Sequence, residues 1–124
     1  MNSRDPQLIA LLFNECINNQ DLDGLTRLMS ESHTFIDRDG NASRPKEVMV
    51  KGWKEFFKMY PTYRNTFTRI QSKDNLVEIL GFAYWSEEKP HDPVIWTAVI
   101  ADDLVQEWRI YADNESNRRR FNLL

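Results

Sequence analysis

The chain has 124 residues, of which 41% are hydrophobic and 28% are charged, and its formal net charge is −3. This length suits one domain, expected over residues 1–124, that buries a real hydrophobic core. The mildly acidic balance excludes the strongly basic surface on which nucleic-acid-binding domains depend, so we expect no nucleic-acid partner.

The N-terminal residues, the apolar runs and the cysteine content indicate the expected cellular compartment. Residues 1–6 lack the apolar core of a signal peptide. No apolar run approaches the roughly 20 residues that a transmembrane helix needs, so we expect no membrane partner. The single cysteine, Cys16, cannot form an internal disulfide and is interpreted as a buried structural residue rather than a nucleophile. A cytoplasmic location is the default expectation.

Two helices are expected first. Asp5 can cap a helix whose first residue is Pro6 and which ends near residue 19. Its apolar stripe, at spacings of three and four, consists of Leu8, Ile9, Leu12, Phe13, Cys16 and Ile17. Asn14 and Asn18 fall outside this stripe. Asp21 can cap a second helix, which would bury Leu22, Leu25, Leu28 and Met29.

A short apolar strand follows at residues 33–37 and ends in a carboxylate, before the turn-like residues 38–40. Side chains alternate along a strand, so His33, Phe35 and Asp37 share one face. Burying an unpaired carboxylate is costly, so this face should meet water or a polar pocket. A loop is expected at residues 39–42.

A third helix is expected from Ser43 to Tyr60, because apolar residues again recur at helical spacing and Pro61 then stops the pattern. Strands are expected at 63–71, 76–86, 94–101 and 104–112, with turns at 72–75 and 102–103 and a charged loop at 87–93. Asp113 and Asn114 could cap a short terminal helix, and the basic run 118–120 would be its solvated face rather than a phosphate site.

The element order predicts an α+β fold. Short links between the four late strands favour antiparallel neighbours. We expect three N-terminal helices packed on a curved, mainly antiparallel sheet, which together form a cone with an internal pocket.

Several segments resemble one known group of proteins. Asn19-Gln20-Asp21-Leu22-Asp23-Gly24-Leu25, followed by a strand that ends at Asp37, is similar to the ketosteroid isomerase and SnoaL-like proteins. Further similarities to this group lie in Gly52-Trp53, Phe56-Phe57, Pro61-Thr62-Tyr63-Arg64-Asn65 and Val105-Gln106-Glu107-Trp108-Arg109-Ile110-Tyr111-Ala112-Asp113. The resemblance covers nearly the whole chain and implies the nuclear transport factor 2-like, cystatin-like fold, which hosts many unrelated activities.

The resemblance implies a role for Asp37. In ketosteroid isomerases an Asp at the end of the first strand is the general base, and Asp37 occupies the matching place. The isomerases build their oxyanion hole from a helix-one Tyr and a late-strand carboxylic acid. The matching positions here hold Phe13 and the Trp96-Thr97 region, which supply neither group. Steroid isomerisation itself is therefore not expected, since loss of one oxyanion donor costs on the order of a hundredfold in rate.

Two residues are candidates for catalysis, Asp37 and His33. Asp37 would be a general base in the pocket, or a carboxylate that accepts backbone N–H groups of its own turn. His33 would be a second acid/base group deeper in the pocket, or a hydrogen-bonded structural residue. The Cα atoms of the two would be about 13 Å apart along the strand, so a direct bond between them is not expected.

Large aromatic residues are candidates for ligand binding, although core packing is the alternative for each. We expect Trp53, Trp96 and Trp108 to line the pocket. Tyr63 and Tyr84 are expected there as hydroxyl donors, either of which could replace the donor missing at Phe13.

The alternating residues Glu107, Arg109 and Tyr111 suggest either cross-strand ion pairs or a homodimer through the sheet. Two distant histidines and one cysteine give no metal-binding spacing, and no phosphate-binding loop is present, so we expect no cofactor. The sequence thus predicts a protein that binds a small apolar molecule, with Asp37 as the base of a cofactor-free isomerase, cyclase or hydratase. The alternative is a non-catalytic binding or dimerisation module with a vestigial pocket.

Overall fold

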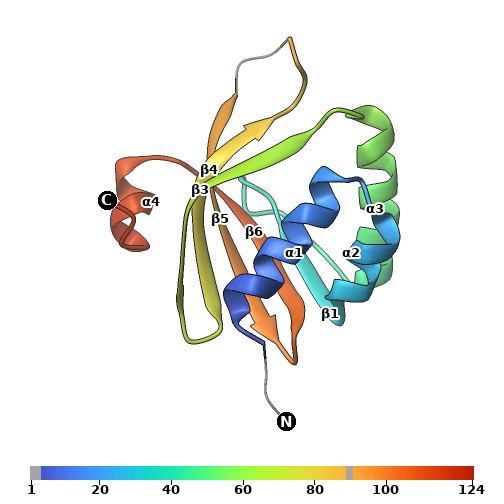
Figure 1. Ribbon diagram of the computed structural model, residues 1–124, viewed down its shortest axis with the longest axis horizontal. Helices are drawn as coiled ribbons and strands as arrows, with labels where there is room; N and C mark the ends of the chain where they lie inside the picture. The colour runs from blue at the N-terminus through green and yellow to red at the C-terminus, as the bar shows by residue number, and fades with distance from the viewer. Residues whose placement is uncertain (1–3, 89–90) are drawn as a thin grey trace.

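The computed structural model describes residues 4–88 and 91–124, so residues 1–3 and part of the expected loop 87–93 lie outside the described residues. Four helices and six strands follow one another in this part of the chain (Figure 1). The elements are α1 (Pro6–Asn18), α2 (Leu22–Leu28), β1 (Met29–Ile36), β2 (Ala42–Ser43), α3 (Lys46–Met59), β3 (Arg64–Lys73), β4 (Leu76–Tyr84), β5 (Asp92–Ala101), β6 (Leu104–Ala112) and α4 (Glu115–Arg120).

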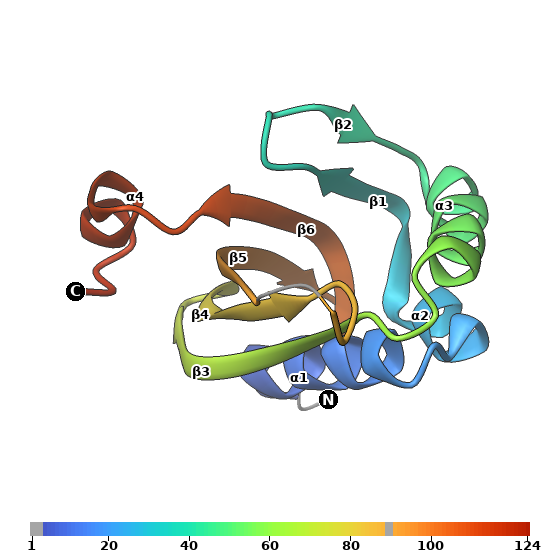
Figure 2. The ribbon, with the colours of Figure 1, turned by 90° about the horizontal axis from the view of Figure 1, so that it is seen from above.

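The strands form one sheet in the order β2-β1-β6-β5-β4-β3. Every pairing is antiparallel except that of β1 with β6, which is parallel. Seen from above, the sheet curls and stays open, with α1, α2 and α3 on its inner side and α4 on the other (Figure 2). The expected α+β fold, with three N-terminal helices on a curved and mainly antiparallel sheet, is therefore confirmed.

Local sequence signals set the element ends as expected. Asp5 accepts a hydrogen bond from the backbone of Gln7, and Asp21 accepts one from Gly24, so both carboxylates cap their helices. Asp102 and Asp103 both have positive φ angles, 53° and 61°, which is the geometry of a tight hairpin turn.

The first helix is rotated relative to its expected stripe. Leu8 is 44% exposed, whereas Asn14 is only 8% exposed. The Asn65 side chain donates to Asn14 Oδ1 over 3.2 Å, so the buried amide is satisfied by a partner far along the chain. Asn14 thus lies outside the expected apolar stripe and is nevertheless buried, because helical periodicity carries no information about such a partner.

Several boundaries also differ. β1 begins at Met29, four residues before the expected strand, because it continues directly from α2 and pairs with Val105. The loop expected at 39–42 instead leads into β2, which pairs with Phe35 and Ile36, and α3 begins at Lys46 rather than Ser43. β5 begins at Asp92 instead of residue 94.

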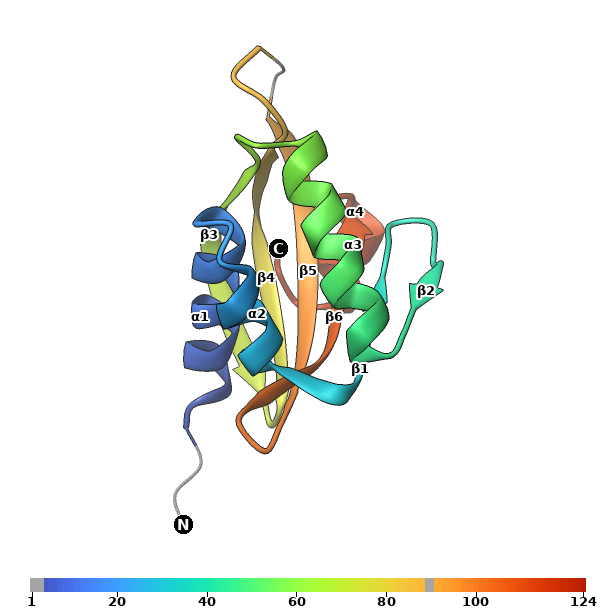
Figure 3. The same ribbon diagram turned by 90° about the vertical axis from the view of Figure 1, so that its right-hand side faces the viewer.

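The inner side holds the main hydrophobic core, which the helices cover. α1 packs on β3 to β6, and α3, which faces the viewer in Figure 3, packs on β1. None of the described helices combines the length and apolarity that a membrane crossing requires.

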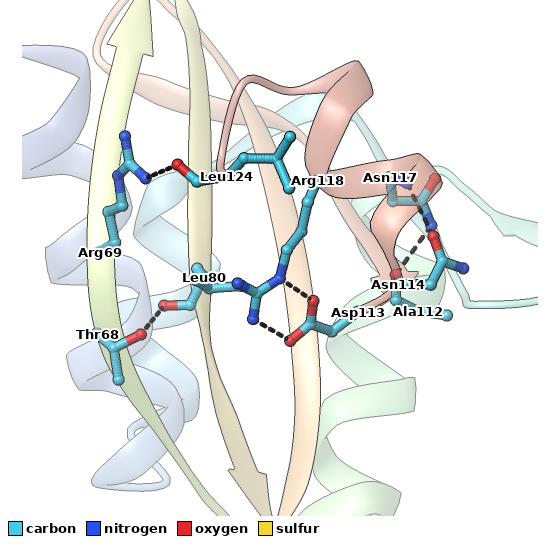
Figure 4. Close-up of polar contacts among 9 residues, drawn as sticks. All are labelled: Thr68, Arg69, Leu80, Ala112, Asp113, Asn114, Asn117, Arg118 and Leu124. Atoms are coloured by element: carbon cyan, nitrogen blue, oxygen red, sulfur yellow. Dashed lines mark hydrogen bonds and ion pairs between the residues drawn. The ribbon is translucent and has the colours of Figure 1, made fainter.

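The outer side carries a second, smaller core beneath α4. Ile95 is fully buried there by Phe121 and Leu123, beside the half-buried Leu80 and Tyr111. The chain end is also held by polar contacts to β3, since Arg69 donates to the carbonyl of Leu124 (Figure 4).

The basic run of α4 is occupied by intramolecular contacts. Arg118 forms a bidentate pair with Asp113, with N–O distances of 2.6 and 2.9 Å (Figure 4). Arg119 pairs with Glu115, and the Arg120 guanidinium lies over the ring of Tyr111. These contacts agree with the expected solvated helix face.

Candidate ligand-binding cavity

A cavity of about 480 Å³ lies between α3 and the inner face of the sheet. This volume falls within the range of roughly 300–1,000 Å³ that small-molecule sites occupy. All four tryptophans of the chain line it. The lining residues are Phe35, Asp37, Arg38, Asp39, Ser43, Met49, Gly52, Trp53, Phe56, Tyr63, Asn65, Trp85, Asp92, Trp96, Trp108 and Ile110.

Strand alternation explains which residues of the sheet line the cavity. Trp96 on β5 lies opposite Ile110 on β6, and Trp108 lies two residues before Ile110 on the same face. Trp53 faces them from α3, and its ring contacts Phe35 on β1 with centroids 6.2 Å apart. The expected positions of Trp53, Trp96 and Trp108 at the pocket therefore agree with the structure; their role in binding stays a prediction.

The two tyrosines expected as hydroxyl donors, Tyr63 and Tyr84, lie in different places. Tyr63 lines the cavity and is only 6% exposed. Burial raises the pKa of its hydroxyl, against a smaller lowering effect of the Asn65 amide, so Tyr63 stays neutral and can donate a hydrogen bond.

Tyr84 lies on the outer face of β4 instead. Its ring packs under the Arg64 guanidinium, 4.5 Å from the ring centroid, and beside His91. The expectation that Tyr84 lines the pocket was wrong, because Tyr84 shares its face of β4 with the charged Glu78, and that face is the outer one. The neighbouring Trp85 lines the cavity in its place.

Asp37 accepts hydrogen bonds from its own turn and also borders the cavity. Its Oδ1 accepts hydrogen bonds from the backbone N–H groups of Asp39 and Asn41, both at 2.9 Å. The residue also lines the cavity mouth. Among the described residues, Oδ2 has no hydrogen-bond donor, so the turn fixes the carboxylate and leaves one oxygen for other contacts.

His33 is fully buried and is not among the residues that line the cavity. Its Nδ1 lies 2.7 Å from the carbonyl oxygen of Val105, and since a carbonyl only accepts, Nδ1 carries the proton. Burial lowers the pKa of His33, and the nearby Lys46 adds to this effect, while the bond to Val105 opposes it. This arrangement matches the hydrogen-bonded structural alternative and leaves a neutral imidazole.

Phe13, the residue at the position of the isomerase tyrosine, is buried in the core. Its ring contacts Trp108 with centroids 4.8 Å apart, and it also approaches His33 and Trp53. In the other matching region, Trp96-Thr97, Trp96 lines the cavity and Thr97 lies on the opposite face of the sheet. Phe13 and Thr97 therefore contribute no donor to the cavity, and neither matching position holds a tyrosine or a carboxylic acid.

An ion pair spans the cavity mouth. Arg38, in the turn after β1, donates to Asp92 at the start of β5 over 2.6 Å. Both residues line the cavity, as does Asp39. This pair could not be inferred from the sequence, because the two residues are 54 positions apart, one in the turn after β1 and the other at the start of β5.

Asn65 is a further lining residue that sequence reasoning missed. Its backbone N–H donates to Asn18 Oδ1 over 2.7 Å, and Asn18 returns a bond to the Asn65 carbonyl. Its side chain donates to Asn14. These bonds tie α1 to the start of β3 and hold Asn65 and the nearby Tyr63 at the cavity wall.

A second, more polar hollow of about 550 Å³ lies between α1, α2 and the turn after β5, and Cys16 borders it. Cys16 is half-buried, and burial, together with the nearby Asp21, raises the pKa of its thiol. A protonated thiol is a poor nucleophile, which agrees with a structural role. Within residues 4–88 and 91–124 no cluster of three or more metal-binding side chains is found.

The sequence matches no protein family and no curated protein. Solved structures share its fold, however. A candidate SnoaL-like polyketide cyclase from Shewanella putrefaciens superposes with a TM-score of 0.78 at 11% identity, covering 99% of this chain and 89% of that one. An LEH-like epoxide hydrolase from M. tuberculosis superposes with a TM-score of 0.78 at 13% identity, covering 87% of this chain and 82% of that one. A candidate ketosteroid isomerase from Kribbella flavida superposes with a TM-score of 0.75 at 13% identity, covering 88% of this chain and 78% of that one.

These similarities show the fold. Other structures that match this chain are described as cystatin-fold and NTF2-like proteins, so the expected nuclear transport factor 2-like fold is confirmed. The three structures above are named for three different reactions, and a shared fold does not select among them.

Proposed function

We propose that this chain is a SnoaL-like protein whose cavity binds a small, largely apolar molecule. The observation that carries this proposal is the convergence of all four tryptophans on one cavity from four separate elements or loops. Apolar and aromatic walls with a few polar groups are what ligand sites in proteins share. Here the polar groups are Tyr63, Asn65 and the charged residues of the mouth.

Binding can be tested with 1-adamantylmethanol, a compact apolar probe that does not absorb where tryptophan is excited. Bound probe should change the intrinsic tryptophan fluorescence and release heat in titration calorimetry. A probe that produces neither signal at millimolar concentration would reject the proposed cavity.

A filled cavity provides the matched control. Gly52 borders the cavity on α3, and a Cβ added there would approach no atom closer than 3.9 Å. Gly52→Leu should therefore fold and abolish probe binding. Lys51→Leu places the same side chain one position earlier, on an exposed residue that does not line the cavity, and should bind the probe as the unmodified protein does.

A second candidate function, general-base catalysis by Asp37, is supported by one specific observation. Two backbone N–H groups fix Oδ1 at the cavity mouth, and Oδ2 has no donor among the described residues. A fixed carboxylate beside an apolar cavity could remove a proton next to a carbonyl, with the neutral Tyr63 hydroxyl as a donor to the developing oxyanion.

This reaction can be measured as deuterium exchange of the α-protons of 2-tetralone in D₂O, followed by NMR. Asp37→Asn retains an oxygen for the turn but removes the base, and it should slow exchange by about a hundredfold or more. Asp74→Asn, which removes a carboxylate that does not line the cavity, serves as the control. Exchange that is no faster than in buffer, or equal in the protein and Asp37→Asn, would leave the non-catalytic binding module as the better description.

A further inference from the structure

Three aromatic rings of the cavity form a corner. Phe56 and Tyr63 have ring centroids 4.8 Å apart at an interplanar angle of 81°. Trp85 lies 5.0 Å from Tyr63 and 5.8 Å from Phe56, at 68° to each. All three line the cavity. Edge-to-face contacts at these distances are ordinary aromatic packing, which fixes the three rings relative to one another. An aromatic wall of this kind can attract an organic ammonium ion to its ring faces.

The charged groups of the cavity favour the same kind of ligand. Three carboxylates line it, those of Asp37, Asp39 and Asp92, against one guanidinium, that of Arg38. Arg38 is engaged by Asp92 over 2.6 Å. The remaining two carboxylates have no cationic partner among the described residues. The mouth therefore carries an excess of negative charge, which attracts cations and repels anions.

The corner and the charged mouth line the same cavity of about 480 Å³, so one ligand can contact both. The charges of Asp92 and Arg38 both perturb the pKa of the Tyr63 hydroxyl, although burial is the largest influence on it. Tyr63 belongs to the corner, and Asp92 and Arg38 belong to the mouth. A compact molecule in the cavity can thus place a cationic group near both.

We propose that the ligand of this cavity is an organic ammonium, a compact apolar molecule that carries a protonated amine. This inference rests on the proposed function, since it names the chemical class that the same cavity selects. The apolar part would lie against Trp53, Trp96 and Trp108, and the ammonium between the aromatic corner and the carboxylates of the mouth.

Three probes with the same apolar cage test the inference. They are 1-adamantylmethylammonium, 1-adamantylmethanol and 1-adamantanecarboxylate, titrated into the protein at neutral pH by calorimetry. The ammonium should bind about tenfold more tightly than the alcohol, a difference that one desolvated cation–aromatic contact can supply. The carboxylate should bind more weakly than either, and added salt should reduce the preference for the ammonium.

The outcomes separate this inference from the function on which it rests. If the alcohol or the carboxylate binds as tightly as the ammonium, the ammonium class is wrong while the apolar cavity stands. If none of the three binds, the proposed function fails.

Two pairs of variants identify the groups responsible. Phe56→Leu removes a ring of the corner but keeps an apolar side chain, and it should reduce ammonium binding more than alcohol binding. Phe57→Leu is the control, because Phe57 is also a half-buried ring of α3 but does not line the cavity. A preference that survives Phe56→Leu unchanged would contradict a role for the corner.

The charge is tested in the same way. Asp39→Asn removes one carboxylate of the mouth and should lower the ratio of ammonium to alcohol affinity about twofold or more. Asp74→Asn, in the turn between β3 and β4, removes a carboxylate that does not line the cavity and should leave the ratio unchanged. Equal ratios in both variants would contradict a role for the charged mouth.

Discussion

The apolar residues on the two faces of the sheet are covered in different ways. Trp96 and Ile95 are neighbours in the chain, yet alternation assigns them to separate cores on opposite sides. The outer face is closed by residues of the chain itself, Phe121 and Leu123. The inner face is covered by helices that leave a cavity of about 480 Å³. The contrast is between an outer face that is packed by the chain beneath α4 and an inner face that retains unfilled space.

The largest expected effect concerns the inner face. Trp108 is 1% exposed and is shared by the core and the cavity wall. Trp108→Ala should lower the free energy of unfolding by about 3–5 kcal/mol, measured by urea denaturation, because a large buried ring is lost. Gln106→Ala, on an exposed position of the same strand, should change it by less than about 0.5 kcal/mol. Equal losses in the two variants would contradict the assigned core.

A substitution in the outer core should change the stability of the protein but not its binding of a probe. Leu123 is 1% exposed, and Leu123→Ala should cost about 2 kcal/mol, near the low end for a buried leucine because the chain end can adjust. Binding of 1-adamantylmethanol should remain unchanged after this substitution. A parallel loss of binding would show that the two faces are coupled.

The two faces should also lose stability in different pH ranges. Burial lowers the pKa of His33 on the inner face below 6.5, so the unfolded chain takes up protons more readily than the folded one. The free energy of unfolding should therefore fall as the pH drops below about 6.5, and His33→Phe should remove this dependence.

On the outer face, the bond from Arg118 lowers the pKa of Asp113 below its usual 3.8. The contribution of this ion pair to the free energy of unfolding is present above about pH 4 and is lost only at lower pH. Denaturant titrations at several pH values measure both effects. A midpoint for unfolding that is constant from pH 7 to pH 5 would contradict the inner-face assignment.

The smallest expected effect contrasts two glycines near the cavity mouth. Gly52 lies within α3, so Gly52→Ala should raise the free energy of unfolding by about 0.5–1 kcal/mol. Gly40 has a φ angle of 87°, and Gly40→Ala should lower the free energy of unfolding instead, because its backbone conformation disfavours a side chain. Thermal unfolding of both variants checks the opposite signs, and shifts of the same sign would contradict the two backbone assignments.

Features that depend on neighbouring residues were predictable from the sequence. The caps at Asp5 and Asp21 and the turn at residues 102–103 follow from local chemistry, and each was expected at its observed place. The α+β order followed from the succession of such elements. β2 was missed because two residues carry no periodicity.

Features that depend on distant partners could not be predicted. The burial of Asn14 requires Asn65, which lies 51 positions away, and the ion pair at the mouth joins Arg38 to Asp92 at the start of β5. The side of β4 on which Tyr84 lies could have been recognised, in contrast, because the charged Glu78 shares that face. Asp37 and three of the four tryptophans were identified as pocket residues, Asp37 from the alternation along its strand, while the resemblance to the isomerases implied only its role as a base.

The parallel pairing of β1 with β6 has a consequence for how the chain folds. β3 to β6 form a meander of neighbouring hairpins, which closes through short loops and can form early. β1 joins it only through contacts such as the bond between His33 and Val105, which spans 72 positions. Closing so long a loop is entropically costly, so β1 is expected to dock late. Because the cavity exists only after that step, a bound molecule should slow unfolding without accelerating folding.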